Sequence, residues 1–434
     1  MVGSRFDLSA YTVPMQSRAS PPSLPRTAQG AARLYAIDWL RVAVMGVVYL
    51  FHVLRVFDVD PGASLKNEQT SVVASIYTFF VNQWQMPAFF FLAGISTWFS
   101  LQSRSGKQYL QERVRRLLIP LLFGSLTLVP WYAYWSALNH GTFQGSWPAY
   151  LTLHFPRTWQ VIKSTPEYQH GMGVLFAISW HLWFLGYLFV FSAAALPLLG
   201  RAAAGPRARI VHSLAALSTR WWGLGALGIP LVVLRTILNA RFPAYLDWSD
   251  TLVWFAAFLL GWLFGTDSRF LSAVRAQAGA WVTAGCAGFG LLLTAYARGY
   301  LVQWLARPAY TWDYLIFQIV SGIHTWAWLL GITGMALRRL HFSGRSLDYA
   351  GEAVMPFYML HYAVILTIGV FVVRWETAIF WKILVISVSS FVVTCAIYEV
   401  AIRRIPLLRT LFGMKAVRQE NGSGIRASAP GSRG

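Results

Sequence analysis

Residues 35–57 read YAIDWLRVAVMGVVYLFHVLRVF, and this stretch decides the fold class. It is apolar almost throughout and long enough for a helix to cross the hydrocarbon core of a bilayer, which is about 30 Å thick. It nevertheless contains an acid, a guanidinium and an imidazole, in Asp38, Arg41 and His52. An ionisable side chain costs several kcal/mol in hydrocarbon unless it is paired or reaches water, so these residues are the first candidates for a functional site.

The composition extends the membrane interpretation to the whole chain. Of 434 residues, 56% are hydrophobic and only 12% are charged, whereas a soluble protein carries about 25% charged residues. Short alternating strands between polar turns, typical of a membrane β-barrel, are not found. Apolar runs of about 20 residues predict an all-α, polytopic membrane protein with ten transmembrane helices, at roughly 34–56, 72–99, 117–138, 174–200, 219–239, 249–266, 279–298, 313–338, 352–374 and 377–401.

The net charge of +20 is distributed between the spans rather than on one folded face, which argues against nucleic-acid binding. Alternate connections are rich in Arg and Lys, and the positive-inside rule places such connections in the cytoplasm. The rule predicts that both termini are cytoplasmic, with inner basic residues that include Arg104, Lys107, Arg113, Arg115, Arg116, Arg338, Arg339 and Arg345.

Three segments follow from this pattern. Residues 1–33 are rich in Pro, Ser, Ala and Arg and predict a disordered cytoplasmic tail. Residues 34–401 form the ten-helix domain, and residues 402–434 predict a basic, largely disordered cytoplasmic tail. Without an appended soluble domain, any chemistry is expected among the helices.

The first span has a polar stripe. Arg41 and His52 are eleven positions apart, about 1100° of helical rotation, so they point the same way to within about 20° and lie about 16 Å apart along the axis. Asp38, three residues before Arg41, is close enough to pair with it. A simpler interpretation is that Arg41 extends inward with Asp38 neutralising it, and that His52 is an ordinary buried histidine.

Other spans supply polar partners, namely Gln83, His181, Tyr358 and His361. Neutral polar groups in spans often only bond helices together, and this is the preferred interpretation for Asn82, Gln85 and His324. No spacing typical of a metal site, a phosphate-binding loop or a hydrolase nucleophile occurs, and the outer-loop histidines His140, His154 and His170 have no ligand spacing.

A basic cluster lies at residues 111–120, QERVRRLLIP, where a helix is expected to emerge into the cytoplasm. Arg113, Arg115 and Arg116 carry guanidinium groups, which bind phosphates in bidentate fashion. The alternative is that the cluster only fixes the topology.

The spacing Arg41-x10-His52 in a first span resembles the Arg-x10-His motif of the membrane acyltransferase-3 family. The remaining blocks of that family also occur in order over nearly the whole ten-helix region: QMPAFFFLAGIS at 85–96, RVRRLLIP at 113–120, WHLWFLGYL at 180–188 and MPFYMLHYAVI at 355–365. The amino-acid sequences of these blocks are similar to those of the family branch that contains periplasmic glucan succinyltransferases.

The resemblance implies transfer of an acyl group, acetyl or succinyl, from cytoplasmic acyl-CoA to a hydroxyl of an extracytoplasmic carbohydrate. It implies a bacterial inner-membrane protein with acyl-CoA as co-substrate and without a permanently bound cofactor or metal. In this interpretation the catalytic residues are His52, Arg41 and Asp38. His52 is the general base, and Arg41, oriented by Asp38, binds the donor or stabilises the negative charge that grows on the thioester oxygen. Arg113, Arg115 and Arg116 bind CoA. His181, Tyr358, His361 and Gln83 then line the channel or orient the acceptor.

Two alternatives stay open at this point. Transfer is either direct or through an acyl-histidine intermediate. A transporter or flippase for a sugar- or lipid-linked substrate would also use buried charges. Pro87, Pro230 and Pro356 interrupt spans, but the sequence shows no two matching halves of the kind typical of transporters. The oligomeric state leaves no signal in the sequence.

Overall fold

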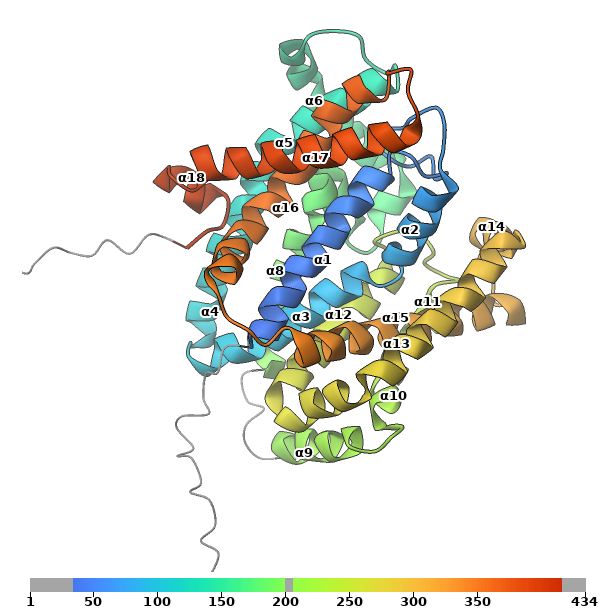
Figure 1. The fold of residues 1–434 in the computed structure, drawn as a ribbon, viewed down its shortest axis with the longest axis vertical. Coiled ribbons are helices and arrows are strands. Elements are labelled where there is room, and N and C mark those ends of the chain that lie inside the picture. Colours follow the sequence, from blue (N-terminus) through green and yellow to red (C-terminus); the bar gives the residue numbers. More distant parts are fainter. Residues whose placement is uncertain (1–33, 200–205, 416–434) are drawn as a thin grey trace, which may run out of the picture. The chain divides into compact units, whose positions relative to one another are not determined.

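The computed structural model describes residues 34–199 and 206–415, and within these ranges the chain forms helices and no strand. The tails expected at residues 1–33 and 416–434 lie outside the described residues. Figure 1 shows the helices in chain order. The all-α prediction is confirmed, and the chain is a polytopic membrane protein.

Among the described residues, eight helices are long and apolar enough to cross a membrane, and each overlaps one of the ten predicted spans. Three of them contain a short 3₁₀ or π-helical turn, denoted η. The eight are α1 (Tyr35–Leu54), α4–η1–α5 (Gly106–Asn139), α7–η3–α8 (Gly173–Leu199), α12 (Trp248–Thr266), α13 (Ser268–Ala297), α15 (Trp312–Arg339), α16 (Arg345–Val372) and α17–η4 (Ile379–Ile402).

The two other predicted spans are interrupted. The run 72–99 is divided between α2 (Val72–Asn82) and α3 (Gln85–Gln102), because the backbone leaves the helical conformation at Trp84, with φ −132° and ψ −16°. The run 219–239 is divided between α10 (Gly223–Leu227) and α11 (Ile229–Leu238). Pro87 and Pro230 each lie in the first turn of the new helix, where a missing N–H leaves no hydrogen bond unmade.

Two neighbouring side chains of α15 hold these interruptions in place. Thr325 donates to the carbonyl oxygen of Gln83 at 2.9 Å, and Trp326 Nε1 donates to the carbonyl oxygen of Leu224 at 2.8 Å. Trp326 also covers Gly228, where an added Cβ would lie 2.3 Å from the indole. Both interruptions are therefore packed into the protein, as non-helical backbone at membrane depth must be.

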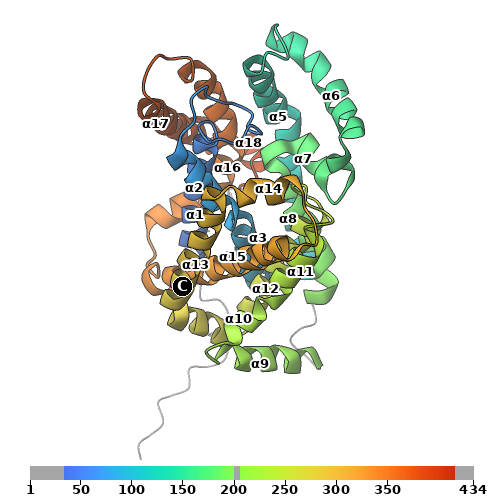
Figure 2. The ribbon, with the colours of Figure 1, turned by 90° about the vertical axis from the view of Figure 1, so that its right-hand side faces the viewer.

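The remaining helices connect or flank the spans. α6 (Trp147–Ser164) and α9 (Pro206–Ser218) lie at opposite ends of the folded unit in both views (Figures 1 and 2). A 3₁₀ turn, η2 (Pro166–Gln169), follows α6, and α14 (Tyr300–Ala306) follows α13.

Residues 402–415, assigned from the sequence to the C-terminal tail, include a folded segment. α18 (Pro406–Leu411) follows α17–η4 there. Arg409 donates to the Glu352 carboxylate on α16 at 2.7 Å, and Phe412 is buried. The folded domain therefore continues past residue 401.

α3 and α12 pack at very close range because glycine lies at the crossing. A Cβ added to Gly94 would lie 2.0 Å from the carbonyl oxygen of Phe258, and one added to Gly261 would lie 1.9 Å from that of Phe91. Small residues allow this kind of backbone contact between membrane helices.

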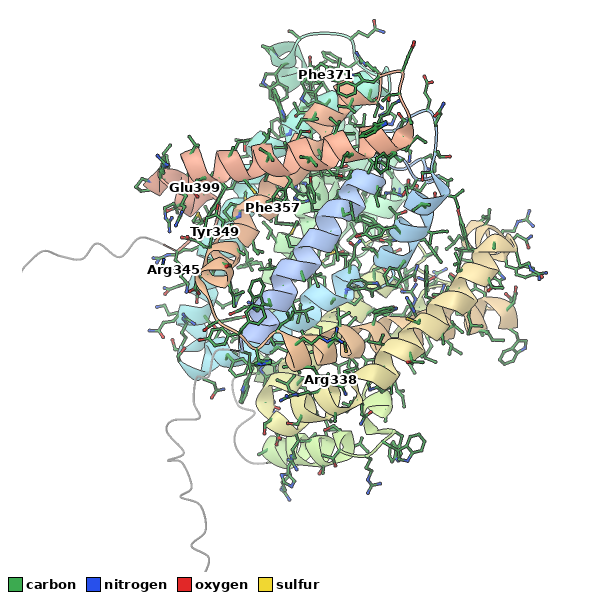
Figure 3. The ribbon with its side chains drawn as sticks, in the orientation of Figure 1. Arg338, Arg345, Tyr349, Phe357, Phe371 and Glu399 are labelled. Carbon is green, nitrogen blue, oxygen red and sulfur yellow. The ribbon has the colours of Figure 1, made fainter. Side chains whose placement is uncertain are left out.

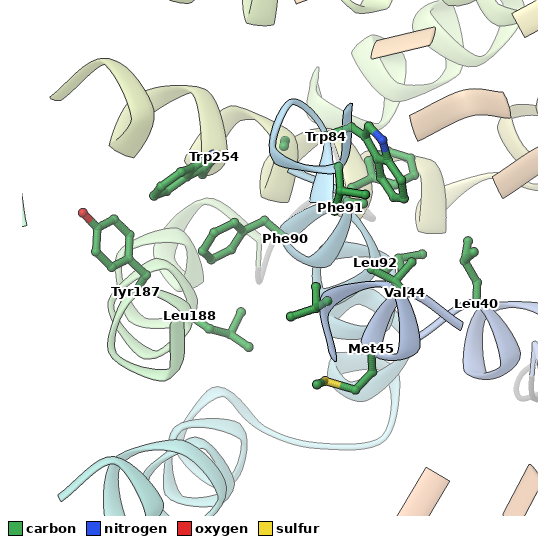
Figure 4. Close-up of a cluster of buried hydrophobic side chains, with 14 of the residues drawn as sticks. Leu40, Val44, Met45, Trp84, Phe90, Phe91, Leu92, Tyr187, Leu188 and Trp254 are labelled. Carbon is green, nitrogen blue, oxygen red and sulfur yellow. The ribbon is translucent and has the colours of Figure 1, made fainter. Parts of the chain in front are cut away.

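Aromatic side chains fill the space beside this crossing. The Phe90 ring stacks on Trp254 with centroids 5.8 Å apart and lies 6.4 Å from the ring of Tyr187 (Figure 4). On the other side of α3, α1 presents Val44 and Met45 to the core (Figure 4). α1 also packs against α2, α15, α16 and α17, and the residues of its polar stripe are partly buried.

Candidate active site

Three histidines from distant parts of the chain meet beside the C-terminal half of α1. His52 comes from α1, His181 from η3 (Trp180–Leu182) and His361 from α16. Their ring centroids are 5.2 Å apart for His52 and His361, 5.5 Å for His181 and His361, and 6.4 Å for His52 and His181. We call these three residues the histidine cluster. Its members are all residues that the sequence singled out.

His181 lies at a strained interruption of its span. The preceding residue, Trp180, has φ +45°, a conformation that non-glycine residues rarely adopt. Such strain persists only where the surrounding structure imposes it, and it concentrates at functional sites. The turn directs the His181 ring into the bundle, where the residue is buried.

Both ring nitrogens of His181 have partners. Nε2 lies 3.2 Å from the carbonyl oxygen of Tyr358, and Nδ1 lies 3.2 Å from the hydroxyl of Tyr132. The hydroxyl of Tyr358 in turn donates to the carbonyl oxygen of His181. Because a carbonyl oxygen only accepts, Nε2 carries the proton of the neutral ring. These bonds fix the orientation of His181.

His361 is fully buried, and its ring is fixed from one side only. Nδ1 lies 2.7 Å from the carbonyl oxygen of Tyr358 and 3.1 Å from that of Phe357. Phe357, labelled in Figure 3, stacks parallel to the imidazole at 5.9 Å. Nδ1 therefore carries the proton, and Nε2 presents a lone pair that has no partner among the described residues.

His52 differs from the other two histidines. Its ring is half-buried, and within residues 34–199 and 206–415 it makes no hydrogen bond. Its closest ring neighbour is Tyr362, with centroids 4.8 Å apart. His52 is therefore the member of the cluster whose nitrogens remain available to a substrate.

A charged loop follows α1 next to His52. Arg55 contacts the carboxylates of Asp58 at 2.9 Å and Asp60 at 2.7 Å, and Lys66 contacts Asp58 at 2.8 Å. Partial burial alone would raise the pKa of the Asp60 carboxyl, but the hydrogen bond and charge of Arg55 outweigh it and hold that pKa below its usual value. These ion pairs order the loop beside the cluster.

The loop is also bonded to α16. The hydroxyl of Tyr362, whose ring lies against His52, donates to Ser64 at 2.6 Å. Sequence reasoning missed Tyr132 and Tyr362. Tyr362 follows His361 directly, but the contact of its ring with α1 left no signal in the sequence.

The N-terminal end of the polar stripe on α1 is built around Arg41. Its guanidinium lies 3.4 Å from the Asp38 carboxylate and also donates to the hydroxyl of Ser96 on α3. Ser96 belongs to the block FFFLAGIS but was not singled out from the sequence. The two partners hold Arg41 from the side of α1 and from the side of α3.

Arg113 and Arg116 come close to Arg41, and their positive charges act on it. Arg113 directly precedes the π-helical turn η1 (Val114–Leu118), and Arg116 lies within it. Turns of this type are rare and often found at functional sites. The Arg113 guanidinium covers the ring of Tyr109 at 4.7 Å. We call Arg41, Arg113 and Arg116 the arginine cluster.

Arg115 and Gln83 are not part of either cluster. Arg115 is exposed and makes no hydrogen bond or ion pair within the described residues. Gln83 lies at the interruption between α2 and α3, and no hydrogen bond joins it to the histidine cluster in the described structure. In the part of the chain that the structure describes, no group of three or more His, Cys, Asp or Glu side chains is arranged to hold a metal ion.

Comparison with known proteins identifies the family of the chain. A family model described as an acyltransferase domain matches residues 34–399. "Glucans biosynthesis protein C" of Salmonella schwarzengrund is 22% identical over 416 residues, covering 91% of this chain and 98% of the relative. The protein of the same name from Salmonella typhi is 21% identical over the same coverage. No solved structure matches. The chain therefore belongs to the acyltransferase-3 family and is a membrane acyltransferase.

Proposed function

We propose that this protein transfers an acetyl or succinyl group from acyl-CoA on the cytoplasmic side to a carbohydrate hydroxyl on the opposite side of the bacterial inner membrane. The observation that carries the proposal is the placement of two sites along α1. His52, without a hydrogen bond, lies in the histidine cluster, and Arg41 lies in the arginine cluster about 16 Å away along the helix axis. The names of the relatives support a glucan or a related carbohydrate as acceptor.

The histidine cluster suits activation of the acceptor. A sugar hydroxyl becomes a good nucleophile only as its proton is removed, and a neutral imidazole does this near neutral pH. His52 takes the proton while the oxygen attacks the thioester carbonyl carbon. The C–O bond forms, the C–S bond breaks, and the departing thiolate receives the proton from the His52 imidazolium. An acyl-histidine intermediate would use the same residue in two steps.

The arginine cluster suits the donor. Three guanidinium groups with two nearby carboxylates, Asp38 and Glu112, leave a local excess of positive charge. Guanidinium groups bind phosphate oxygens through paired, charge-assisted hydrogen bonds, and the CoA nucleotide carries several phosphates. Arg115, exposed on the same turn, adds to the attraction without a fixed partner.

A second candidate function has one observation in its favour. The interruptions between α2 and α3 and between α10 and α11 resemble the discontinuous helices of transporters. Both, however, are tied to adjacent residues of α15, whereas transporter sites lie between two repeated halves. A flippase would move its substrate without cleaving a thioester.

The experiment that separates the two functions uses the full chain in nanodiscs. Acetyl-CoA or succinyl-CoA is added with a β-glucan oligosaccharide, and released thiol and acylated sugar are measured together. An acyltransferase forms both products in equal amounts, and His52→Ala forms them at least about 100-fold more slowly although it still binds acyl-CoA. Thiol release that is absent with both donors, together with sugar movement across a vesicle membrane, would favour the transporter.

A further inference from the structure

The lone pair on Nε2 of His361 is a buried polar group in the histidine cluster that the proposed chemistry leaves unused. The residue has no exposed surface, and its other nitrogen is held by the carbonyl oxygens of Phe357 and Tyr358. A buried acceptor without a partner costs about 1–3 kcal/mol. Sites that keep such a group need an explanation, and a role in chemistry is one.

We propose that His361 is a positioning residue for His52. Its Nε2 accepts a hydrogen bond from one ring N–H of His52, while the opposite nitrogen of His52 takes the proton of the acceptor hydroxyl. This inference rests on the proposed function and assigns the partner that sets the tautomer of the base. Sequence and family comparison assign no such role to this residue.

The geometry favours His361 over His181 as that partner. The His361 ring is closer to His52, at 5.2 Å between centroids against 6.4 Å for His181. Both nitrogens of His181 already have partners, whereas Nε2 of His361 has none within the described residues. His52 is not held by hydrogen bonds, so rotation of its ring brings a nitrogen toward Nε2 without breaking a bond.

The proton balance is simple. When His52 becomes an imidazolium, both of its nitrogens carry protons, and the inner N–H needs an acceptor in a site from which water is largely excluded. Nε2 of His361 supplies it, and Nδ1 of His361 keeps its own proton on the two carbonyl oxygens. The arrangement fills the place that a carboxylate fills behind the histidine of a serine hydrolase triad.

The test removes the Nε2 lone pair of His361 while keeping an aromatic ring at this position. His361→Phe preserves the stacking on Phe357 and removes Nε2. In nanodiscs with acetyl-CoA or succinyl-CoA and a β-glucan oligosaccharide, kcat should fall about 100-fold, the lower end of what acid–base assistance contributes. KM for the acyl-CoA should not change, because the arginine cluster is about 16 Å away along α1. His361→Gln places an amide oxygen near the position of Nε2 and should recover part of the lost rate.

His324 provides a matched control. It is also fully buried on a neighbouring helix, its Nδ1 bonds the carbonyl oxygen of Gly285 at 2.9 Å, and its Nε2 has no partner among the described residues. Its ring contacts within the described residues are with Phe80, Phe289 and Trp328, and not with His52. His324→Phe should therefore leave kcat of the folded protein within about twofold of wild type.

The outcomes separate this inference from the proposed function. Wild-type kcat in folded His361→Phe overturns the role of His361, while transfer by the unchanged chain still supports the proposed function. Absence of transfer by the unchanged chain with these donors overturns the proposed function, and with it this inference. His52→Ala and the double variant His52→Ala/His361→Phe should be equally slow, because residues that act as a unit are not additive. If the double variant has a kcat below that of His52→Ala by the same factor by which His361→Phe lowers the kcat of the unchanged chain, the two residues act independently and the inference is overturned.

Discussion

His181 and Tyr358 bond each other reciprocally: Nε2 of His181 donates to the carbonyl oxygen of Tyr358, and the hydroxyl of Tyr358 donates to the carbonyl oxygen of His181. The pair joins the strained turn at Trp180 to α16. The Tyr358 carbonyl oxygen also accepts from Nδ1 of His361, so one backbone group orients two members of the histidine cluster.

Tyr358→Phe removes the hydrogen bond from the Tyr358 hydroxyl to the carbonyl oxygen of His181 and should weaken the connection between the turn at Trp180 and α16. Loss of one hydroxyl-to-carbonyl bond is expected to cost about 1 kcal/mol of unfolding free energy and to lower kcat by up to about tenfold, because a displacement worth 1.4 kcal/mol at the transition state has that effect. Thermal unfolding in detergent and steady-state acyl transfer measure the two quantities.

Tyr187→Phe is the control, because the Tyr187 hydroxyl also donates to a backbone carbonyl oxygen, that of Leu246 at 2.9 Å. It should lose similar stability and keep wild-type kcat. Equal losses of kcat in both variants would mean that the reciprocal pair has no special role in the site.

The arginine cluster makes a prediction about the donor. Arg113→Ala combined with Arg116→Ala should weaken acyl-CoA binding by at least about tenfold, since hydrogen bonds to charged groups contribute about 1.5–3 kcal/mol each. Arg115→Ala, which removes an exposed guanidinium without a fixed partner, should change the affinity much less. Calorimetric titration with acetyl-CoA at two salt concentrations gives the values. Unchanged affinity in the double variant would leave the cluster with a topological role only.

The crossing of α3 and α12 predicts a stability effect. Gly94→Ala places a Cβ 2.0 Å from a backbone oxygen of α12, and backbone cannot yield as a flexible side chain can. The cost should reach or exceed the 1–3 kcal/mol or so that is typical of overpacking. Gly46→Ala on α1, where nothing lies within 4 Å of the added atom, should cost nothing. Thermal unfolding of both variants in the same detergent checks the contrast, and an equal effect at both positions would contradict the close approach.

His154 on α6 predicts a pH dependence outside the spans. Burial lowers the pKa of His154 to about 4, from an ordinary value of 6.5. The folded state then binds the proton less readily than the unfolded state, so stability is fully present above about pH 6.5 and declines as the pH falls toward 4. The hydrogen-exchange protection factors of residues 147–164, corrected for the intrinsic exchange rate at each pH, should fall across this window, and His154→Leu should remove that fall. Protection factors that stay constant between pH 6.5 and pH 4 in the unchanged chain would show that His154 is not buried in solution.

The part of the candidate site that lies on one helix could be predicted from the sequence: α1 contains Asp38, Arg41 and His52, and Asp38 is paired with Arg41. Helical periodicity placed Arg41 and His52 on one face of one helix, and the spacing of three residues placed Asp38 beside Arg41. Those statements need only the geometry of a single helix. The contact of His52 with His181 and His361 depends on how three helices pack, and periodicity within each helix carries no information about it.

The interruptions were harder to foresee for a related reason. Residues 72–99 form one apolar run, and hydropathy does not register a backbone turn at Trp84 that Thr325 stabilises from a distant helix. The orientation of His181 likewise depends on the positive φ of Trp180, a residue type that gives no local signal for such a conformation. The guanidinium pattern at 113–116 was visible in the sequence, but that Arg115 lies exposed while its neighbours approach Arg41 depends on the π-helical turn.

The central claim is that His52 removes the proton of the acceptor during acyl transfer. A single-turnover measurement tests it most directly: the full chain in nanodiscs is loaded with radiolabelled acetyl-CoA or succinyl-CoA, mixed with a β-glucan oligosaccharide, and compared with His52→Ala loaded to the same extent. We expect labelled sugar from the unchanged chain and a rate at least about 100-fold lower from His52→Ala. Equal rates from two equally loaded proteins would contradict the account.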